Sequence, residues 1–165
     1  MIDLTLNTTL VHSILIRFIQ EQVNRAGFQR AVLGLSGGVD SALACFLAAE
    51  ALGAQNVLAV RMPYHTSSSA SLTHAQQVID ALGVQSLTIP ITEMVDPYLA
   101  RYPGASDVRK GNIMARQRMI VLYDQSAAFP GLVVGTGNKT ERLLGYTTHY
   151  GDSACAFNPL GDLYK

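Results

Sequence analysis

The chain has 165 residues, of which 48% are apolar and 15% charged, and its 12 basic and 12 acidic side chains give a formal net charge of zero. This length and apolar content suffice for one hydrophobic core, so we expect a single domain over residues 1–165. Without an excess or a run of Lys and Arg, the sequence offers no electrostatic surface for nucleic acid or an anionic membrane, and we expect neither as a partner.

The first predicted element is a helix. Leu10, Ile14, Phe18 and Val23 belong to an apolar stripe at helical spacing that ends near Gly27. Short apolar runs at residues 31–35, 57–62, 86–91 and 132–135 predict strands, and helices are predicted over residues 42–52, about 71–82 and about 92–129. This alternation predicts an α/β fold, a doubly wound parallel sheet with helices on both faces. Ligands of such sheets bind beyond the carboxyl ends of the strands.

The loop after the first predicted strand, S-G-G-V-D-S at residues 36–41, has the composition of an anion-binding turn. Gly37 and Gly38 let the backbone approach an anion closely, and the first N–H groups of the following helix favour phosphate oxygens. Asp40 would repel a phosphate unless a divalent cation lay between them, so it predicts Mg²⁺ bound with a nucleotide. The Walker-type loop is not matched, because Asp40 stands where that motif has lysine.

Polar side chains also follow the other predicted strands. Arg61 lies near the end of the second strand and either lines a nucleotide pocket or forms a structural ion pair. The polar run at residues 66–71 is either a mobile lip of that pocket or a solvated loop with a helix N-cap. Thr136 and Glu141 follow the last strand, where hydroxyl and carboxylate suit nucleotide and metal, although an ordinary helix N-terminus has the same composition.

Arg116 and Arg118 lie on the long predicted helix and point about 200° apart, so they must have different roles. Ile113, Ile120 and Tyr123 share the side of Arg116, which predicts that its guanidinium lies beside the packed face. Arg118 then has a structural role, lies in a subunit interface or is a solvated surface residue.

The same helix is apolar on two sides, which predicts a homodimer. The second apolar face bears Met114, Arg118 and Leu122 and would be covered by the partner subunit.

The start of the chain lacks the basic and apolar blocks of a signal peptide, and its apolar runs are short for a bilayer span, so we expect a cytoplasmic protein. Cys45 and Cys155 have no metal-ligand spacing and are expected to pack. We find no Ser/His or Cys/His arrangement typical of a protein nucleophile.

Four blocks of the sequence together resemble the NAD⁺ synthetase family. S-G-G-V-D-S at residues 36–41 resembles the pyrophosphate-binding loop of the ATP pyrophosphatases, and it is followed by K-G-N-I-M-A-R-Q-R-M at 110–119, G-T-G-N-K-T-E at 135–141 and G-Y-T-T-H-Y-G-D at 145–152. The resemblance runs from about Leu33 to the last residue. It implies the adenine nucleotide alpha-hydrolase-like fold.

The resemblance also implies the site residues. ATP would be bound by Gly34, Leu35, Ser36, Gly37, Gly38, Val39, Asp40, Ser41, Arg61, Thr136 and Lys165. Mg²⁺ would be bound by Asp40 and Glu141. The second substrate, deamido-NAD⁺, would be contacted at Arg116, His149 and Ala156, near the boundary of a homodimer.

This sequence departs from the family pattern at two of these positions. His149 stands where some relatives have lysine, and Ala156 stands where several have an aspartate that binds substrate. Lys165 matches a family lysine but is the last residue, whereas relatives continue. We therefore expect a domain incomplete at its C-terminus and, without a glutaminase domain, free ammonia as the nitrogen donor.

The implied reaction is the ATP-dependent amidation of deamido-NAD⁺ through an adenylated nicotinate carboxylate. ATP would be split to AMP and pyrophosphate, so the chain is expected to be a ligase. Two alternatives remain open, namely another ATP pyrophosphatase with the same loop and an ATP-binding module of this family without turnover.

Overall fold

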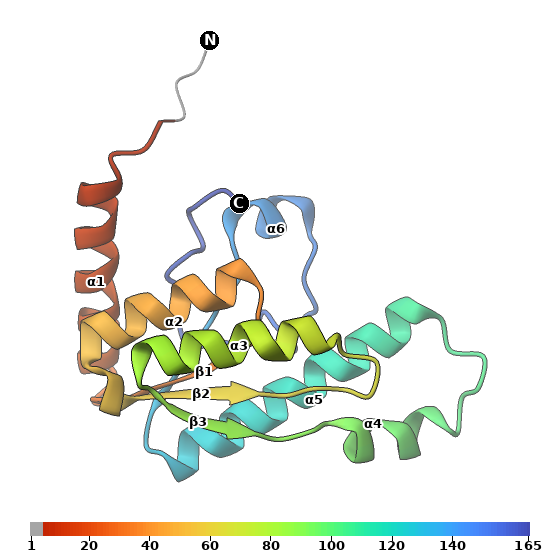
Figure 1. The fold of residues 1–165 in the computed structure, drawn as a ribbon. Helices are drawn as coiled ribbons and strands as arrows, with labels where there is room; N and C mark the ends of the chain where they lie inside the picture. Colours follow the sequence, from red (N-terminus) through yellow and green to blue (C-terminus); the bar gives the residue numbers. More distant parts are fainter. Residues whose placement is uncertain (1–4) are drawn as a thin grey trace.

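The computed structural model describes residues 5–165 and contains a four-stranded parallel sheet (Figure 1). Its strands are β1 (Ala31–Gly34), β2 (Val57–Arg61), β3 (Gln85–Thr88) and β4 (Leu132–Val134), in the order β3-β2-β1-β4. Ala31 pairs with Val57 on one side and with Leu132 on the other. The chain therefore adds β2 and β3 on one side of β1 and later returns to add β4 on the other side. The order of strands reverses between β1 and β4, and the predicted doubly wound parallel sheet is confirmed.

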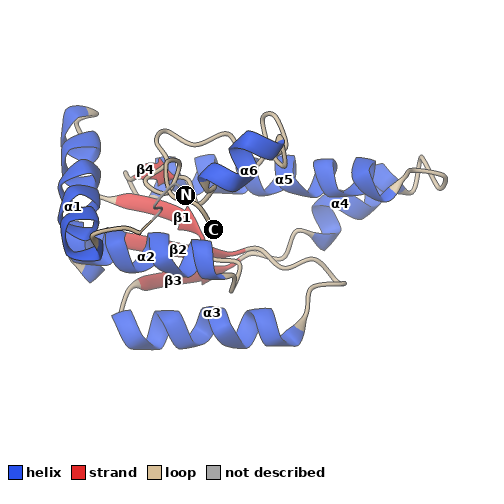
Figure 2. Ribbon diagram, turned by 90° about the horizontal axis from the view of Figure 1, so that it is seen from above, coloured by secondary structure: helices blue, strands red, loops and turns tan. Residues whose placement is uncertain are grey.

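Helices cover both faces of this sheet (Figure 2). One face packs against α1 (Thr8–Arg25), α2 (Val39–Leu52) and α3 (Ser69–Leu82), and the other against α4 (Thr92–Leu99) and α5 (Asp107–Ala128). The short η1 (Ala54–Asn56) precedes β2, and α6 (Lys139–Leu144) follows β4. Ala31 and Leu33 of β1 belong to the first apolar cluster, whereas Val32 belongs to the second. Burial on both faces explains why β1, β2 and β4 are apolar at nearly every position, whereas the edge strand β3 is mostly exposed and polar.

The structure divides the helical region predicted over residues 92–129 into two helices. A turn at residues 100–106 separates α4 from α5 and contains Pro103 and Gly104. The hydroxyl of Ser106, the N-cap of α5, accepts a hydrogen bond from the backbone N–H of Arg109 at 3.4 Å. The turn residues and the cap therefore end one helix and begin another, and the prediction of one long helical region is wrong here.

Two element boundaries matter for the site. The strand predicted at 86–91 ends at Thr88, although Ile89 and Ile91 still donate backbone hydrogen bonds to Arg61 and Pro63 at 2.8 and 2.9 Å. The helix predicted from residue 42 begins at Val39. Asp40 and Ser41 therefore lie in the first turn of α2 rather than in the preceding loop.

The face of α5 predicted to form a subunit interface lies against the sheet instead. Met114 and Leu122 pack onto the second apolar cluster, and Arg118 donates from Nε to the carbonyl oxygen of Met62 at 3.1 Å. The prediction of this face as free for a partner is wrong, because these side chains already cover the sheet.

Among the described residues, no helix combines the length and the apolar character needed to cross a membrane.

Candidate nucleotide-binding site

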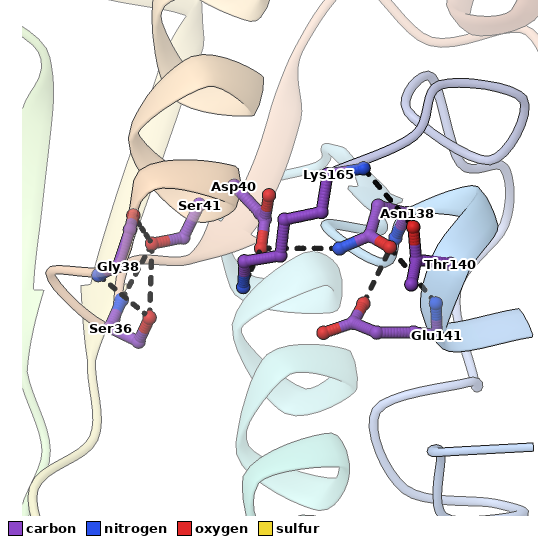
Figure 3. Close-up of polar contacts among 8 residues, drawn as sticks. All are labelled: Ser36, Gly38, Asp40, Ser41, Asn138, Thr140, Glu141 and Lys165. Atoms are coloured by element: carbon purple, nitrogen blue, oxygen red, sulfur yellow. Dashed lines mark hydrogen bonds and ion pairs between the residues drawn. The ribbon is translucent and has the colours of Figure 1, made fainter. Parts of the chain in front are cut away.

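Two serine side chains brace the glycine-containing loop between β1 and α2 (Figure 3). The buried hydroxyl of Ser41 accepts a hydrogen bond from the backbone N–H of Ser36 at 3.2 Å and donates to the carbonyl of Gly38 at 2.9 Å. The hydroxyl oxygens of Ser36 and Ser41 lie 3.0 Å apart. These contacts fix the shape of the turn that leads into α2.

The N-terminus of α2 can receive an anion. Gly38 is its N-cap and has no side chain with which to satisfy the N–H groups of the first turn. Gly38, Ser36 and Ser41 line a small cavity of about 160 Å³. Free N–H groups and the helix dipole favour phosphate oxygens at this place, as expected from the sequence.

Gly37 lets the same loop approach α3 closely. Its φ of +84° is a left-handed conformation, and a Cβ atom added there would lie 2.1 Å from the backbone oxygen of Ser71. No side chain other than hydrogen fits, so Gly37 couples the position of the loop to the N-terminal turn of α3.

Two carboxylates reach the small cavity from different helices. Asp40 comes from α2 and Glu141 from α6, and Asn138 connects them. The Asn138 amide nitrogen donates to Asp40 Oδ2 at 3.4 Å, and its oxygen accepts from the backbone N–H of Glu141 at 2.9 Å. Glu141 Oε2 in turn accepts from the backbone N–H of Asn138 at 3.0 Å, which completes a capping box. Glu141 thus caps its helix and also lines the cavity.

Lys165 lies beside the first of these carboxylates (Figure 3). Its Nζ is 3.0 Å from Asp40 Oδ2, and its backbone N–H donates to the Thr140 hydroxyl at 3.2 Å. The hydrogen bond to Asp40 raises the pKa of the Lys165 ammonium, so this side chain is positively charged at neutral pH.

The residues around the small cavity fit a magnesium ion bound together with a phosphate. In residues 5–165, no group of three or more His, Cys, Asp and Glu side chains is arranged to hold a metal. Asp40 and Glu141 supply two carboxylates, and Mg²⁺ is typically held by one or two carboxylates, water and the phosphates of its nucleotide. The donor set therefore suits a metal that arrives with the nucleotide.

A larger cleft of about 1110 Å³ extends from the loop along the carboxyl ends of β1, β2 and β4. Its lining includes Gly34, Leu35, Arg61 and Thr136, which the resemblance implies as ATP contacts, together with Arg118. The position agrees with the rule that ligands of doubly wound sheets bind where the strand order reverses.

The structure corrects the prediction for the two arginines of α5. Arg118 is half-buried and lines the cleft, and burial lowers the pKa of its guanidinium. Arg116 is exposed, as are Ile120 and Tyr123 on its side of the helix, at 54% and 43%, and only Ile113 on that side packs against the second apolar cluster. The prediction that Arg116 lies beside the packed face is therefore wrong. Apolar residues occur on all sides of α5, so their spacing did not show which of the two arginines is half-buried.

The segment that follows α6 lies across from α5. Arg116 Nε donates to the carbonyl oxygen of His149 at 3.1 Å, and the hydroxyl of Thr148 lies 2.8 Å from Asn112 Oδ1. His149 and Ala156 are exposed and, like Arg116, are not among the residues that line the cleft. The structure thus joins Arg116 to His149, and none of the three predicted dinucleotide contacts lines the cleft.

Cys155 lines the cleft, whereas Cys45 lies on the buried side of α2. Burial raises the pKa of the Cys45 thiol to about 12 and also raises the pKa of the Cys155 thiol. Both thiols are protonated at neutral pH and are poor nucleophiles.

Three residues that shape the site are not among the predicted site residues. Asn138 is 2% exposed and connects Asp40 to Glu141, and its signal is the N-x-x-E spacing of a capping box. Asp152 lines both cavities, and Gln76 contacts Arg61 from α3. Neither of these two has a local motif that could have identified it.

Together, the switch point, the open helix N-terminus and the paired carboxylates define a doubly wound α/β protein with a candidate nucleotide site. A family model described as NAD synthase matches residues 11–165, and the chain belongs to this family.

Similar proteins support this assignment. The chain is 57% identical to the NH(3)-dependent NAD(+) synthetase of Trichlorobacter lovleyi over 98% of its own length and 59% of that protein. Its fold is similar to the NH3-dependent NAD synthetase from Campylobacter jejuni in complex with the nitrate ion, with a TM-score of 0.92, 43% identity, and 98% and 70% of the two chains covered. It is also similar to the glutamine-dependent NAD+ synthetase from Acinetobacter baumannii in complex with ADP, with a TM-score of 0.92, 36% identity, and 100% and 32% covered. The chain thus spans about 59% of the length of the curated relative.

Proposed function

We propose that this chain carries the catalytic site for ATP-dependent amidation of deamido-NAD⁺ to NAD⁺, with free ammonia as the nitrogen donor. Membership of the NAD synthase family supports this reaction over those of other ATP pyrophosphatases. The observation that carries the proposal is the meeting of an open helix N-terminus at Gly38 with the carboxylates of Asp40 and Glu141 in one cavity.

The chemistry follows from the charge of the substrate. A carboxylate is a poor acyl donor, because its oxygen leaves badly and its charge repels a nucleophile. When a carboxylate oxygen attacks the α-phosphorus of ATP, pyrophosphate leaves and an acyl-adenylate forms. Ammonia then attacks the acyl carbon, and AMP leaves with the former carboxylate oxygen. Positioning and electrostatics can supply this catalysis without a protein nucleophile.

The loop residues act on the phosphates. The N–H groups at the start of α2 would bind the departing pyrophosphate, while the ammonium of Lys165 and the guanidinium of Arg61 would offset its charge. Asp40 and Glu141 would hold Mg²⁺, which supplies further positive charge at the phosphate oxygens. Lys165 must then share or leave its contact with Asp40 when the metal binds.

Arg116 and His149 are proposed to contact deamido-NAD⁺ together. Arg116 Nε donates to the backbone carbonyl of His149 at 3.1 Å, so the hydrogen bond holds a planar cation, suited to phosphate or carboxylate, at this segment. Ala156 offers no side-chain hydrogen bond, so any contact there uses backbone or apolar atoms.

A homodimer also belongs to this proposal, but with an interface different from the predicted one. The exposed side of α5 bears Arg116, Ile120 and Tyr123, so a partner on this side would lie beside the proposed dinucleotide contacts. Light scattering would measure the oligomeric state. We also propose that residues 1–165 form a single domain and that the protein is cytoplasmic.

Calorimetric titration with ATP tests the site directly. Asp40→Asn keeps the size of the side chain but removes the metal-binding charge, so affinity for ATP in the presence of Mg²⁺ should fall about tenfold or more. Without Mg²⁺ the loss should be smaller. Asp124→Asn makes the same charge change on the exposed surface of α5 and should bind as the wild type does. Unchanged Mg²⁺-dependent affinity in Asp40→Asn would remove Asp40 from the metal site.

A further inference from the structure

Arg61 enters the cleft from the end of β2 and is held from one side by α3. Its Nη1 donates to Gln76 Oε1, while its Nε is buried without a hydrogen-bond partner. Arg61 also takes no part in the ion pairs found among the described residues. A neutral amide therefore fixes the guanidinium without cancelling its charge.

A second residue fixes the orientation of that amide. The Gln76 amide nitrogen donates to Asp80 Oδ1 at 2.7 Å, one helical turn further along α3. An ionised carboxylate only accepts hydrogen bonds, so Asp80 holds the NH₂ group on its own side. The amide oxygen of Gln76 must then point to Arg61. Exchange of the two amide ends would place donor against donor at Arg61 and acceptor against acceptor at Asp80.

The unpartnered Nε shows that these protein contacts do not satisfy Arg61. A buried donor without an acceptor is costly, and Arg61 lines the cleft close to the loop at Ser36. Only one N–H of the guanidinium is bonded to Gln76, so its other N–H groups are left for an acceptor on a nucleotide in the cleft. The helix that carries Gln76, α3, also contacts the glycine loop, because the backbone oxygen of Ser71 lies close to Gly37.

We propose that Gln76 is a positioning residue that aims Arg61 at an anionic or electron-rich group of the nucleotide, with Asp80 acting through Gln76. This inference rests on the proposed function, because the ligand is taken to be ATP. Gln76 itself touches no ligand. Its effect on binding must therefore disappear when Arg61 is absent.

A double-mutant cycle tests this dependence. Gln76→Met keeps the length of the side chain and loses the acceptor, so it should weaken Mg²⁺-ATP binding about five- to tenfold by calorimetry. In an Arg61→Met background, the same change should have almost no further effect. Gln77→Met, on the exposed neighbouring position of α3, is the matched control and should leave affinity unchanged.

A readout without ligand keeps the test separate from folding. Arginine side-chain NMR should show faster rotation of the Arg61 guanidinium in Gln76→Met and in Asp80→Ala than in the wild type, and thermal unfolding should show that both variants fold. An equal loss of ATP affinity with and without Arg61, or no loss in Gln76→Met, would overturn the inference alone. Absence of Mg²⁺-ATP binding by the wild type would overturn the proposed function and, with it, this role of Gln76.

Discussion

At the scale of single residues, the two arginines of α5 show how different surroundings separate two identical side chains. Arg118 is half-buried, lines the cleft and donates to the backbone of Met62. Arg116 is exposed and donates to the backbone of His149. Both guanidinium groups are fixed by a carbonyl oxygen, which leaves their remaining N–H groups for ligands. The two positions belong to different parts of the surface and should serve different ligands.

Alanine substitutions should separate the two roles. Arg116→Ala should weaken deamido-NAD⁺ binding by about 1.5 to 3 kcal/mol, the usual effect of losing a charged hydrogen bond, and should nearly spare ATP binding. Arg118→Ala should spare deamido-NAD⁺ but lower both ATP affinity and the melting temperature, because it removes a half-buried side chain from the cleft. Calorimetry with each ligand measures both. An equal loss of dinucleotide affinity in the two variants would contradict the separation.

The sequence was most informative about the candidate site where its residues are adjacent in the chain. In S-G-G-V-D-S the glycines, the hydroxyls and the following helix are adjacent, so the pattern alone predicts an anion-binding turn that the structure supports with an open helix N-terminus. The burial of Arg118 depends instead on the rotation of α5 about its axis. Ile113, Met114, Ile120 and Leu122 give α5 no single apolar stripe, so the sequence could not define that rotation.

At the scale of the elements, the contact between the glycine loop and α3 is the most sensitive structural feature of the site. The sequence predicted both elements but not their contact, because a tertiary approach between Gly37 and Ser71 leaves no periodic signal. The same limit applies to the turn between α4 and α5. There, Pro103, Gly104 and the Ser106 cap override a helical pattern that otherwise continues.

Two glycines with the same backbone conformation offer a matched test of this contact. Gly27 and Gly37 have φ of +80° and +84°, but a Cβ would meet nothing within 4 Å at Gly27 and the Ser71 oxygen at 2.1 Å at Gly37. Gly27→Ala should therefore cost only the conformational term of about 1–2 kcal/mol. Gly37→Ala should cost about 1–3 kcal/mol more and should also reduce ATP binding, because the loop must move.

Chemical denaturation and ATP titration of both variants measure these effects. Equal free energies of unfolding for the two alanine variants, with full ATP affinity in Gly37→Ala, would show that the loop tolerates separation from α3.

At the scale of the whole molecule, the strand order places the site. After β3 the chain crosses to the other side of β1 and adds β4 there. This crossing brings α6, with Glu141, next to the first turn of α2. The alternation of apolar runs predicted this class of fold, since strands buried on both faces are short and apolar throughout. Asp40 contacts both Asn138 and Lys165, which lie 98 and 125 positions further along the chain. Contacts over such separations leave no local pattern in the sequence, so only the folded chain reveals them.

The central claim is that this site transfers a carboxylate oxygen to the α-phosphorus of ATP. The direct measurement uses deamido-NAD⁺ labelled with ¹⁸O in the nicotinate carboxylate, together with Mg²⁺-ATP and ammonium, and mass spectrometry of the products. Attack of the carboxylate on the α-phosphorus followed by release of AMP predicts one labelled oxygen in AMP for each NAD⁺ formed, and none in pyrophosphate. Unlabelled AMP, or Mg²⁺-ATP binding without NAD⁺ formation, would contradict the claim, and the second result would identify a nucleotide-binding module without turnover.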